Sequence, residues 1–304
     1  MKPLNLFYLI FALAGLLGNG PARAETKTIH DMLKKKTSQV VESLNSGNWR
    51  ERDLAVCVAS QRWAELNAKK DQATPEELVE KDRIALGLIK LLERSHEESE
   101  KWWEEYAKTE YKVRPPPRSP CEDCHINLVE AVMDLNDKRA LKALIGAVHN
   151  GREISDRVAS YGKEAIAPLI ERSKITKDDD LKGYLLYTLA KIAKRQDVDV
   201  GNKSKIKDLL KKGLNDAEWS VRKGAIKGVS ELNDPEFIPL VEETLVREEL
   251  DPKTKKMKHN LVKIYGEKTL GKLRAKKREI EEAKKNKNSQ NKLQPGTTQG
   301  INVP

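Results

Sequence analysis

The clearest hydrophobic pattern in the chain lies between residues 214 and 245. Apolar residues recur there at the three- and four-residue spacing of an amphipathic helix. They are Val221, Ala225, Ile226, Val229 and Leu232 in the first half and Ile238, Val241 and Leu245 in the second. Polar turns at 215–216 and 233–234 precede the two halves, and Pro235 suits the first position of a helix. The pattern predicts a helical hairpin.

A related pattern surrounds Trp49 when that residue is aligned with Trp219. The matching pairs are Leu44 and Leu214, Asn45 and Asn215, Arg52 and Arg222, Ala55 and Ala225, and Val56 and Ile226. The Leu-Asn-Asp turn also recurs at residues 135–137. Self-similarity of this kind is typical of a repeat array, in which each hairpin buries its apolar face on its neighbours.

Helical periodicity continues through most of the chain, and no segment shows the alternation of a strand. The further predicted helices cover residues 26–44, 74–106, 124–135, 141–148, 157–170 (a hairpin with Gly162 at its turn), 178–194, 206–214 and 261–283. We therefore predict an all-α fold, an α-solenoid of stacked helical hairpins. The predicted parts are an N-terminal helical segment (25–112), a proline-rich connector (113–120), the repeats (121–250), basic helices (251–285) and a disordered tail (286–304).

The motif around Arg222 resembles a HEAT repeat. Asp216 is followed by Val221, Arg222 and Ala225 at the spacing of that family, and Asp234-Pro235 stands at the next turn. The resemblance implies that the motif arginine reaches the turn acid of a neighbouring repeat. It also implies an extended surface that binds other macromolecules.

Residues 1–24 have the pattern of a secretory signal peptide. Lys2 precedes an apolar run at 4–17, and Ala22-Arg23-Ala24 forms a small-x-small cleavage site. We expect a periplasmic or secreted protein cleaved near Ala24; the alternative is an uncleaved membrane anchor.

The positive charge is concentrated at the C-terminal end. Without Lys2 and Arg23 the net charge falls from +10 to +8, and residues 251–304 alone hold 15 basic and 5 acidic residues. One interpretation is a solvated cap on the array; the other is contact with an anionic envelope surface. The candidate contacts are Lys276, Lys277, Arg278, Lys284 and Lys285. Nucleic acid is not expected, because the chain is predicted to be exported and no aromatic residues interleave with the lysines after Lys268.

The sharpest chemical motif is Cys121-Glu-Asp-Cys124-His125. Its spacing is typical of covalent haem attachment, as in c-type cytochromes. The candidates for a second axial ligand are Met133, His149, Met257 and His259. We prefer a structural Cys121–Cys124 disulfide, with pairing to Cys57 as an alternative, because the chain is predicted to enter an oxidising compartment. Zinc and thioredoxin-like redox roles have less support, since no second ligand pair and no preceding strand is present.

Trp102, Trp103 and Tyr106 cluster in a chain with 5% aromatic residues. They suit packing on a neighbouring hairpin, or a platform for carbohydrate or peptide. No nucleophile, base and orienting group can be assembled from the sequence. We therefore predict a non-enzymatic scaffold or adaptor that binds another protein in the periplasm or cell envelope. The alternatives are a c-type haem protein, and an enzyme with an unrecognised site, as bilin-lyase-like relatives of the repeat class suggest.

Overall fold

The computed structural model describes residues 31–108, 122–250 and 260–292, without the side chains of 49, 100, 102–108, 122–127 and 287–292. Every regular element in these ranges is a helix, which confirms the predicted all-α fold. None of the described helices combines the length and the apolar character needed to cross a membrane. The predicted signal peptide and the predicted proline-rich connector lie outside the described residues.

The chain divides into two compact units, residues 1–144 and 145–304. The sequence placed a boundary at the proline-rich segment 113–120, and assigned the following helix to the repeats. That helix, α6 (Glu122–Asp134), belongs to the first unit, because it packs on α4 and α5 and buries Leu128, Val129 and Val132.

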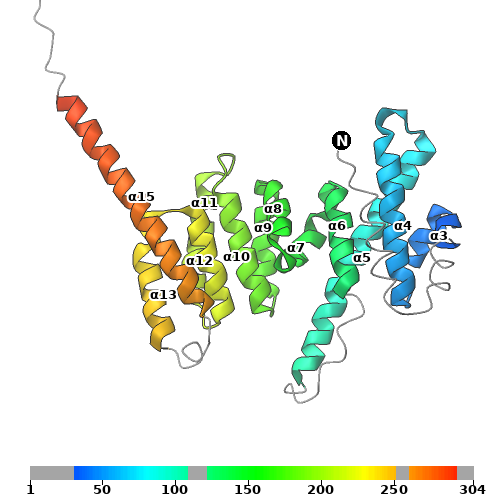
Figure 1. The fold of residues 1–304 in the computed structure, drawn as a ribbon, viewed down its shortest axis with the longest axis horizontal. Helices are drawn as coiled ribbons and strands as arrows, with labels where there is room; N and C mark the ends of the chain where they lie inside the picture. The colour runs from blue at the N-terminus through cyan, green and yellow to red at the C-terminus, as the bar shows by residue number, and fades with distance from the viewer. Residues whose placement is uncertain (1–30, 109–121, 251–259, 293–304) are drawn as a thin grey trace, which may run out of the picture. The chain divides into compact units, whose positions relative to one another are not determined.

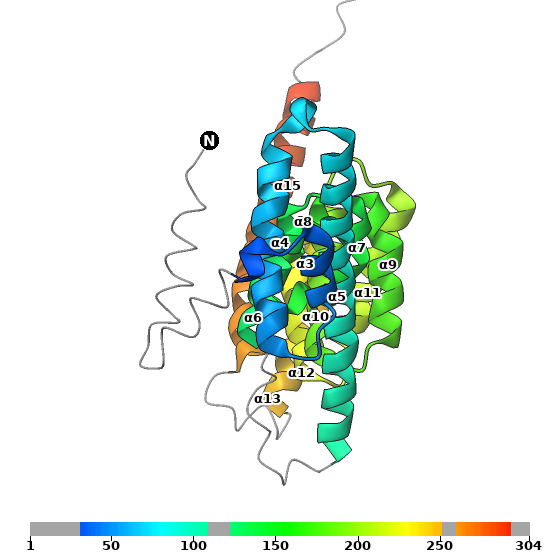
Figure 2. The ribbon, with the colours of Figure 1, turned by 90° about the vertical axis from the view of Figure 1, so that its right-hand side faces the viewer.

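The first unit is built on α3 (Thr37–Ser43), α4 (Trp49–Ala68), α5 (Pro75–Lys108) and α6. The short helix η1 (Lys70–Gln72) lies between α4 and α5, and η2 (Lys138–Ala140) follows α6. Helix α7 (Leu141–Gly146) contains the boundary between the units in the sequence. Helix α3 lies against both α4 and α5 (Figure 2). The predicted start of α5 is confirmed: the Glu77 amide donates to Thr74 Oγ1 at 3.3 Å, and the Thr74 amide donates to Glu77 Oε2 at 3.1 Å.

The helix predicted over 26–44 is interrupted within its described part. Lys36 has an extended backbone, and its amide donates to Gln39 Oε1 at 2.9 Å, so that α3 begins afresh. The guanidinium of Arg62 on α4 donates to the carbonyl oxygens of Leu33 and Lys35. The break is stable because α4 supplies donors to carbonyls at the interruption.

The second unit consists of two rows of helices (Figure 1). One row contains α8 (Arg152–Ser160), α10 (Asp179–Ala193), α12 (Trp219–Leu232) and α15 (Leu261–Lys292), each packed on the next. The other contains α9 (Lys163–Ile175), α11 (Val200–Leu214) and α13 (Ile238–Leu250). Helix α9 packs on α10, α11 on both α10 and α12, and α13 on α11 and α15. Short helices η3 (Val148–Asn150) and η4 (Pro235–Phe237) precede α8 and α13.

In this unit one predicted turn is confirmed, and one helix is longer than predicted. Gly162 stands at the predicted turn with φ of 62°, a conformation that favours glycine. The sequence predicted one or two helices over 251–285 and disorder from 286, but α15 is one helix that continues to Lys292. Residues 286–292 lack apolar side chains, yet extending an established helix avoids the cost of nucleation. The rest of the predicted tail lies outside the described residues.

Helices α10 and α12 approach each other very closely at Gly183 and Gly224. A Cβ on Gly183 would lie 2.6 Å from the Ser220 carbonyl oxygen, and a Cβ on Gly224 would overlap the backbone of Gly183 itself. The two backbones therefore touch without intervening side chains. This contact sets the distance between neighbouring repeats.

Gly224→Ala is expected to destabilise the second unit by about 2 kcal/mol, because the added methyl group forces two helix backbones apart. Gly271→Ala on α15 is the matched control, since nothing lies within 4 Å of a Cβ there. That change should be neutral, or stabilising by up to about 1 kcal/mol from helix propensity. Chemical denaturation measures both. Equal stability of the two variants would contradict the close approach.

Candidate functional site

The predicted turn acids accept hydrogen bonds within their turns and link neighbouring repeats. Asp216 Oδ1 accepts from the Glu218 amide at 3.0 Å, and Asp234 Oδ1 accepts from the Glu236 amide at 3.1 Å. Lysines two helices earlier in the chain reach the same carboxylates: Lys182 Nζ of α10 lies 2.7 Å from Asp216, and Lys207 Nζ of α11 lies 2.5 Å from Asp234. Pro235 occupies the first position of η4, as predicted.

The motif arginines bind glutamates of their own hairpin. Arg222 is 1% exposed, and its Nε donates to Glu248 of α13 at 2.5 Å. Its Nη1 donates to the carbonyl oxygens of Asp216 and Ala217. The contact implied by the HEAT resemblance, from a cation to the turn acid of a neighbouring repeat, is made here by Lys182. In the first unit, Arg52 pairs with Glu98 of α5 at 3.6 Å.

The two aligned sequence patterns fold alike. Arg94 of α5 donates to Asn45 Oδ1 at 3.0 Å, and Arg247 of α13 donates to the matching Asn215 Oδ1 at 2.9 Å. The aligned apolar positions are buried in both units: Leu44, Ala55 and Val56 in the first, and Leu214, Ala225 and Ile226 in the second. Trp49 begins α4 as Trp219 begins α12, although the Trp49 side chain lies outside those described. The alignment of the two segments therefore has a structural counterpart.

The cysteine motif falls outside the described side chains. Cys121 precedes α6, and Cys124 and His125 lie in its first turn. The haem and disulfide hypotheses therefore stay predictions. Met257 and His259, two of the proposed axial ligands, and the aromatic cluster Trp102, Trp103 and Tyr106 also lie outside.

Two other proposed axial ligands are described: Met133 on α6 and His149 on η3. Burial lowers the pKa of the His149 imidazole, and the negative charge of Asp178 opposes this shift. Within the described residues, no group of three or more His, Cys, Asp or Glu is placed to hold a metal ion.

A face of lysines and aromatic rings crosses α10, α12 and α15, and the sequence analysis missed it. Trp219, Lys223 and Lys227 follow one another at four-residue spacing on α12, so they lie on one side of that helix. Opposite them stand Tyr184, Tyr187 and Lys191 of α10 and Tyr265 of α15. We call these seven residues the aromatic–lysine face.

Each ring of this face has an ammonium group above it. Lys227 Nζ lies 5.7 Å from the ring centre of Tyr184 and 4.7 Å from that of Tyr265, so it joins α10 to α15. Lys223 Nζ lies 4.6 Å from the Trp219 ring, and Lys191 Nζ lies 5.0 Å from the Tyr187 ring. These distances allow cation–π attraction.

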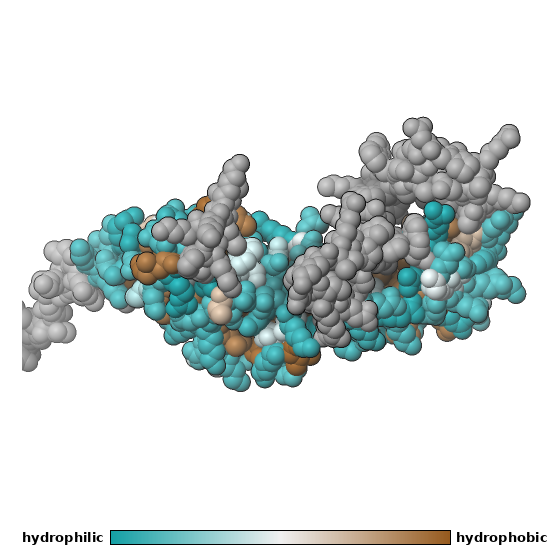
Figure 3. All heavy atoms as spheres, turned by 90° about the horizontal axis from the view of Figure 1, so that it is seen from below, coloured by the Kyte–Doolittle hydropathy of each residue, from teal (hydrophilic) through white to brown (hydrophobic). Residues whose placement is uncertain are grey.

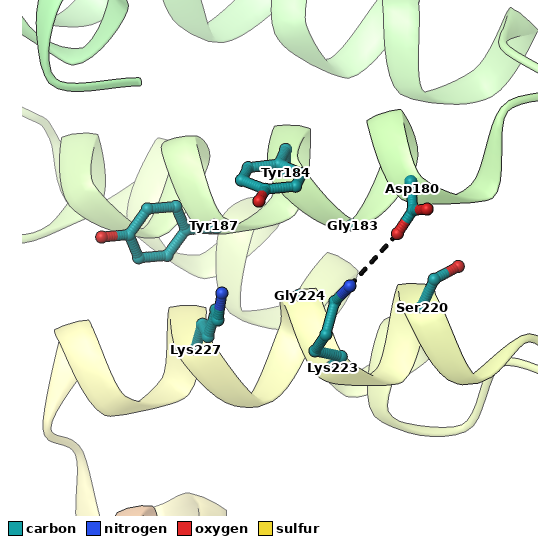
Figure 4. Close-up of a pocket in the computed structure, with 8 residues that line it drawn as sticks. All are labelled: Asp180, Gly183, Tyr184, Tyr187, Ser220, Lys223, Gly224 and Lys227. Carbon is teal, nitrogen blue, oxygen red and sulfur yellow. Dashed lines mark hydrogen bonds and ion pairs between the residues drawn. The ribbon is translucent and has the colours of Figure 1, made fainter. Parts of the chain in front are cut away.

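Two of the three lysines also form ion pairs across helices. Lys223 Nζ lies 3.2 Å from Asp180 Oδ1 on α10 (Figure 4), and Lys191 binds Asp156 on α8. Lys227 makes no ion pair within the part of the chain that the structure describes. Its charge is therefore available to a carboxylate from outside.

The cleft beneath this face is shallow. Gly183 and Gly224 form its floor, with Tyr184, Tyr187 and Lys227 along it (Figure 4). It encloses about 200 Å³ even when open solvent is included, whereas small-molecule sites usually hold at least about 300 Å³. The face suits a partner that lies across it.

A wider groove in the first unit lies along α3, α4 and α5. Its wall carries basic and acidic side chains side by side: Lys35, Lys36, Arg62, Lys69 and Arg83 with Glu65, Glu76 and Glu80. Mixed charge of this kind does not select a ligand. The surface seen in Figure 3 is mostly hydrophilic where it is described, with hydrophobic residues in small separate groups.

The predicted anion contacts lie together on the last half of α15. Lys277, Arg278, Lys284 and Lys285 are exposed, and Lys276 pairs with Glu279 at 2.8 Å. No described residue of this group contributes to the aromatic–lysine face.

No family model matches this sequence, and no curated protein matches it. Among solved structures, two engineered proteins are similar. One is 12% identical, with 79% of this chain and 97% of the other covered and a TM-score of 0.33. The second is 13% identical, with 86% and 77% covered and a TM-score of 0.32. Scores this low carry no argument, so the HEAT resemblance stays a prediction.

The Asp216–Lys182 pair makes stability depend on pH. Burial raises the pKa of Asp216, but hydrogen bonds from Lys182 and the Glu218 amide, with the charges of Lys182 and Arg222, lower it more. A carboxylate whose pKa is lower in the folded than in the unfolded state stabilises the fold. The full contribution is present at pH values above the unfolded pKa of about 3.9, and it is lost as the pH falls through the folded pKa.

Asp216→Asn is therefore expected to lower the thermal unfolding midpoint at neutral pH, and to match the wild type in strong acid. Asp208→Asn is the control, since this exposed carboxylate on α11 has no ion partner within the described residues. Thermal unfolding at a series of pH values tests both. If the unfolding midpoint of Asp216→Asn stays below that of the wild type by the same amount in strong acid, the Asp216–Lys182 pair is not the source of the pH dependence.

Thiol counting separates the disulfide and haem hypotheses for the cysteine motif. Cys57 is free and its side chain reaches solvent, so a reagent has access to it. Nearby protein atoms and the Asp53 carboxylate raise the pKa of its thiol, so labelling should be slow at neutral pH and faster in alkali. A Cys121–Cys124 disulfide predicts one reactive thiol under denaturing conditions, and three after reduction. Attached haem predicts one in both cases.

Proposed function

We propose that this protein is a non-enzymatic scaffold that binds another protein through the aromatic–lysine face. One observation carries the proposal: three lysines cover the rings of Tyr184, Tyr187, Trp219 and Tyr265 on three adjacent helices. The predicted signal peptide adds the location, a periplasm or cell envelope.

The chemistry of the face supports a protein partner. Tyrosine and tryptophan dominate the binding energy of many protein interfaces, because they bury a large rigid surface and still offer a polar group. Tyr184, Trp219 and Tyr265 are only partly buried, so a partner can cover them further. Lys227, placed between two rings, can receive a partner carboxylate. The face therefore suits a segment that combines acidic and apolar side chains.

The shape of the face supports binding over catalysis. Enzyme sites enclose their substrates and exclude water from the reacting groups. The cleft between α10 and α12 instead holds only about 200 Å³, open solvent included, and glycine backbone lines part of it. The alternative function, a c-type haem protein, rests on Cys121, Cys124 and His125 and is tested by thiol counting.

Site-specific crosslinking tests the proposal. A photoreactive phenylalanine at position 184 should crosslink a protein in the native envelope, whereas the same group at exposed Lys205 of α11, in the other row, should not. With the captured protein in hand, Tyr184→Ala should weaken binding about tenfold or more, as truncation of a central aromatic residue does. Lys205→Ala should leave the affinity unchanged. Crosslinking at 205 and not at 184 would move the interface to the other row.

A further inference from the structure

Helix α15 continues well beyond the body of its unit. Leu273 is the last buried side chain among those described on this helix, and Arg274 forms an ion pair with Glu242 of α13 at 2.7 Å. Residues 275–292 extend past α12 and α13 in both ribbon views (Figures 1 and 2). At 1.5 Å per residue this segment is about 27 Å long. We call it the basic arm.

The arm has a large excess of basic residues. It holds seven lysines and arginines and three glutamates, a net charge of 7 − 3 = +4. Lys277, Arg278 and Lys284 are exposed and make no ion pair within the described residues. Their charge is therefore not neutralised by the fold.

The arm continues a stripe that changes character. Val262, Gly266, Thr269 and Leu273 recur at helical spacing and are buried on the side of α15 that packs on the unit. Past Leu273 the same side of the helix carries Lys276, Lys277, Ile280 and Lys284. A helix whose packing stripe turns basic cannot dock on a further apolar repeat.

Most of the described basic and acidic side chains of the arm lie on different sides of the helix. At 100° per residue, the five described basic side chains fall within an arc of about 200°. Glu279 and Glu282 lie outside this arc, and Glu281 lies within it. One half of the arm is therefore basic, and Ile280 is its only large apolar residue. Such a helix can lie on an anionic surface but has no apolar stripe with which to insert.

We propose that the basic arm binds the surface of an anionic phospholipid bilayer and so holds the scaffold at a membrane. A bilayer presents negative headgroups over an area that a straight helix of this length can follow, and each basic residue adds to the attraction. The predicted signal peptide would bring the chain to a membrane. Nucleic acid fits less well, because the arm has no aromatic side chain for stacking on bases.

Binding of vesicles tests this proposal. Purified protein is sedimented with phosphatidylcholine vesicles that contain or lack phosphatidylglycerol, at low and at high salt. The arm variant is Lys277→Glu with Arg278→Glu and Lys284→Glu. The matched control reverses Lys203, Lys205 and Lys212 of α11, which also make no ion pair within the described residues, so both variants lose six units of charge. Circular dichroism and thermal unfolding confirm that both fold.

The wild type should bind only the anionic vesicles, and less at high salt because ions screen the attraction. The arm variant should lose at least about tenfold in partition coefficient, and the control less than about threefold. Equal losses in both variants, or equal binding to both vesicle types, would overturn the proposal. So would wild-type binding to duplex DNA that requires the arm, without binding to vesicles.

Discussion

The contact between Gly183 and Gly224 is the constraint on which the second unit depends. Because neither residue has a side chain, the backbones of α10 and α12 touch. The side chains that flank this contact then meet across the helices, so Lys223 reaches Asp180 and Lys227 reaches the ring of Tyr184. Gly266 allows a similar approach of α15, where a Cβ would lie 2.7 Å from Leu245 Cδ2. The aromatic–lysine face is a consequence of close helix packing.

Polar residues at the turns fix how neighbouring helices of this unit are placed along one another. At Asp216 and Asp234 one carboxylate oxygen accepts from a backbone amide two residues on, while the other binds a lysine: Lys182 of α10 at Asp216 and Lys207 of α11 at Asp234. The buried pair of Arg222 and Glu248 then ties the first helix of the hairpin to the second. A buried pair of this kind adds little net stability, but breaking it leaves an unpaired charge, and so it favours one arrangement of the hairpin over others.

Local features were predictable from the sequence, and contacts between distant segments were not. Apolar spacing located the helices, and the Leu-Asn-Asp turns located the caps, because both depend on neighbouring residues. The break before α3 depends on Arg62 of α4, and the place of α6 in the first unit depends on its packing, so neither could be read locally. Trp219, Lys223 and Lys227 at four-residue spacing were a visible signal for the candidate face. Their partners on α10 and α15 were not visible.

The position of α15 has a consequence for assembly. In an array of identical hairpins, the last hairpin exposes the apolar surface that would pack on a further repeat. Such exposed surfaces can join molecules into filaments. Here α15 crosses both α12 and α13 and buries Val262 and Leu273 on them. The last described hairpin is therefore covered by α15, so its apolar side is not left open.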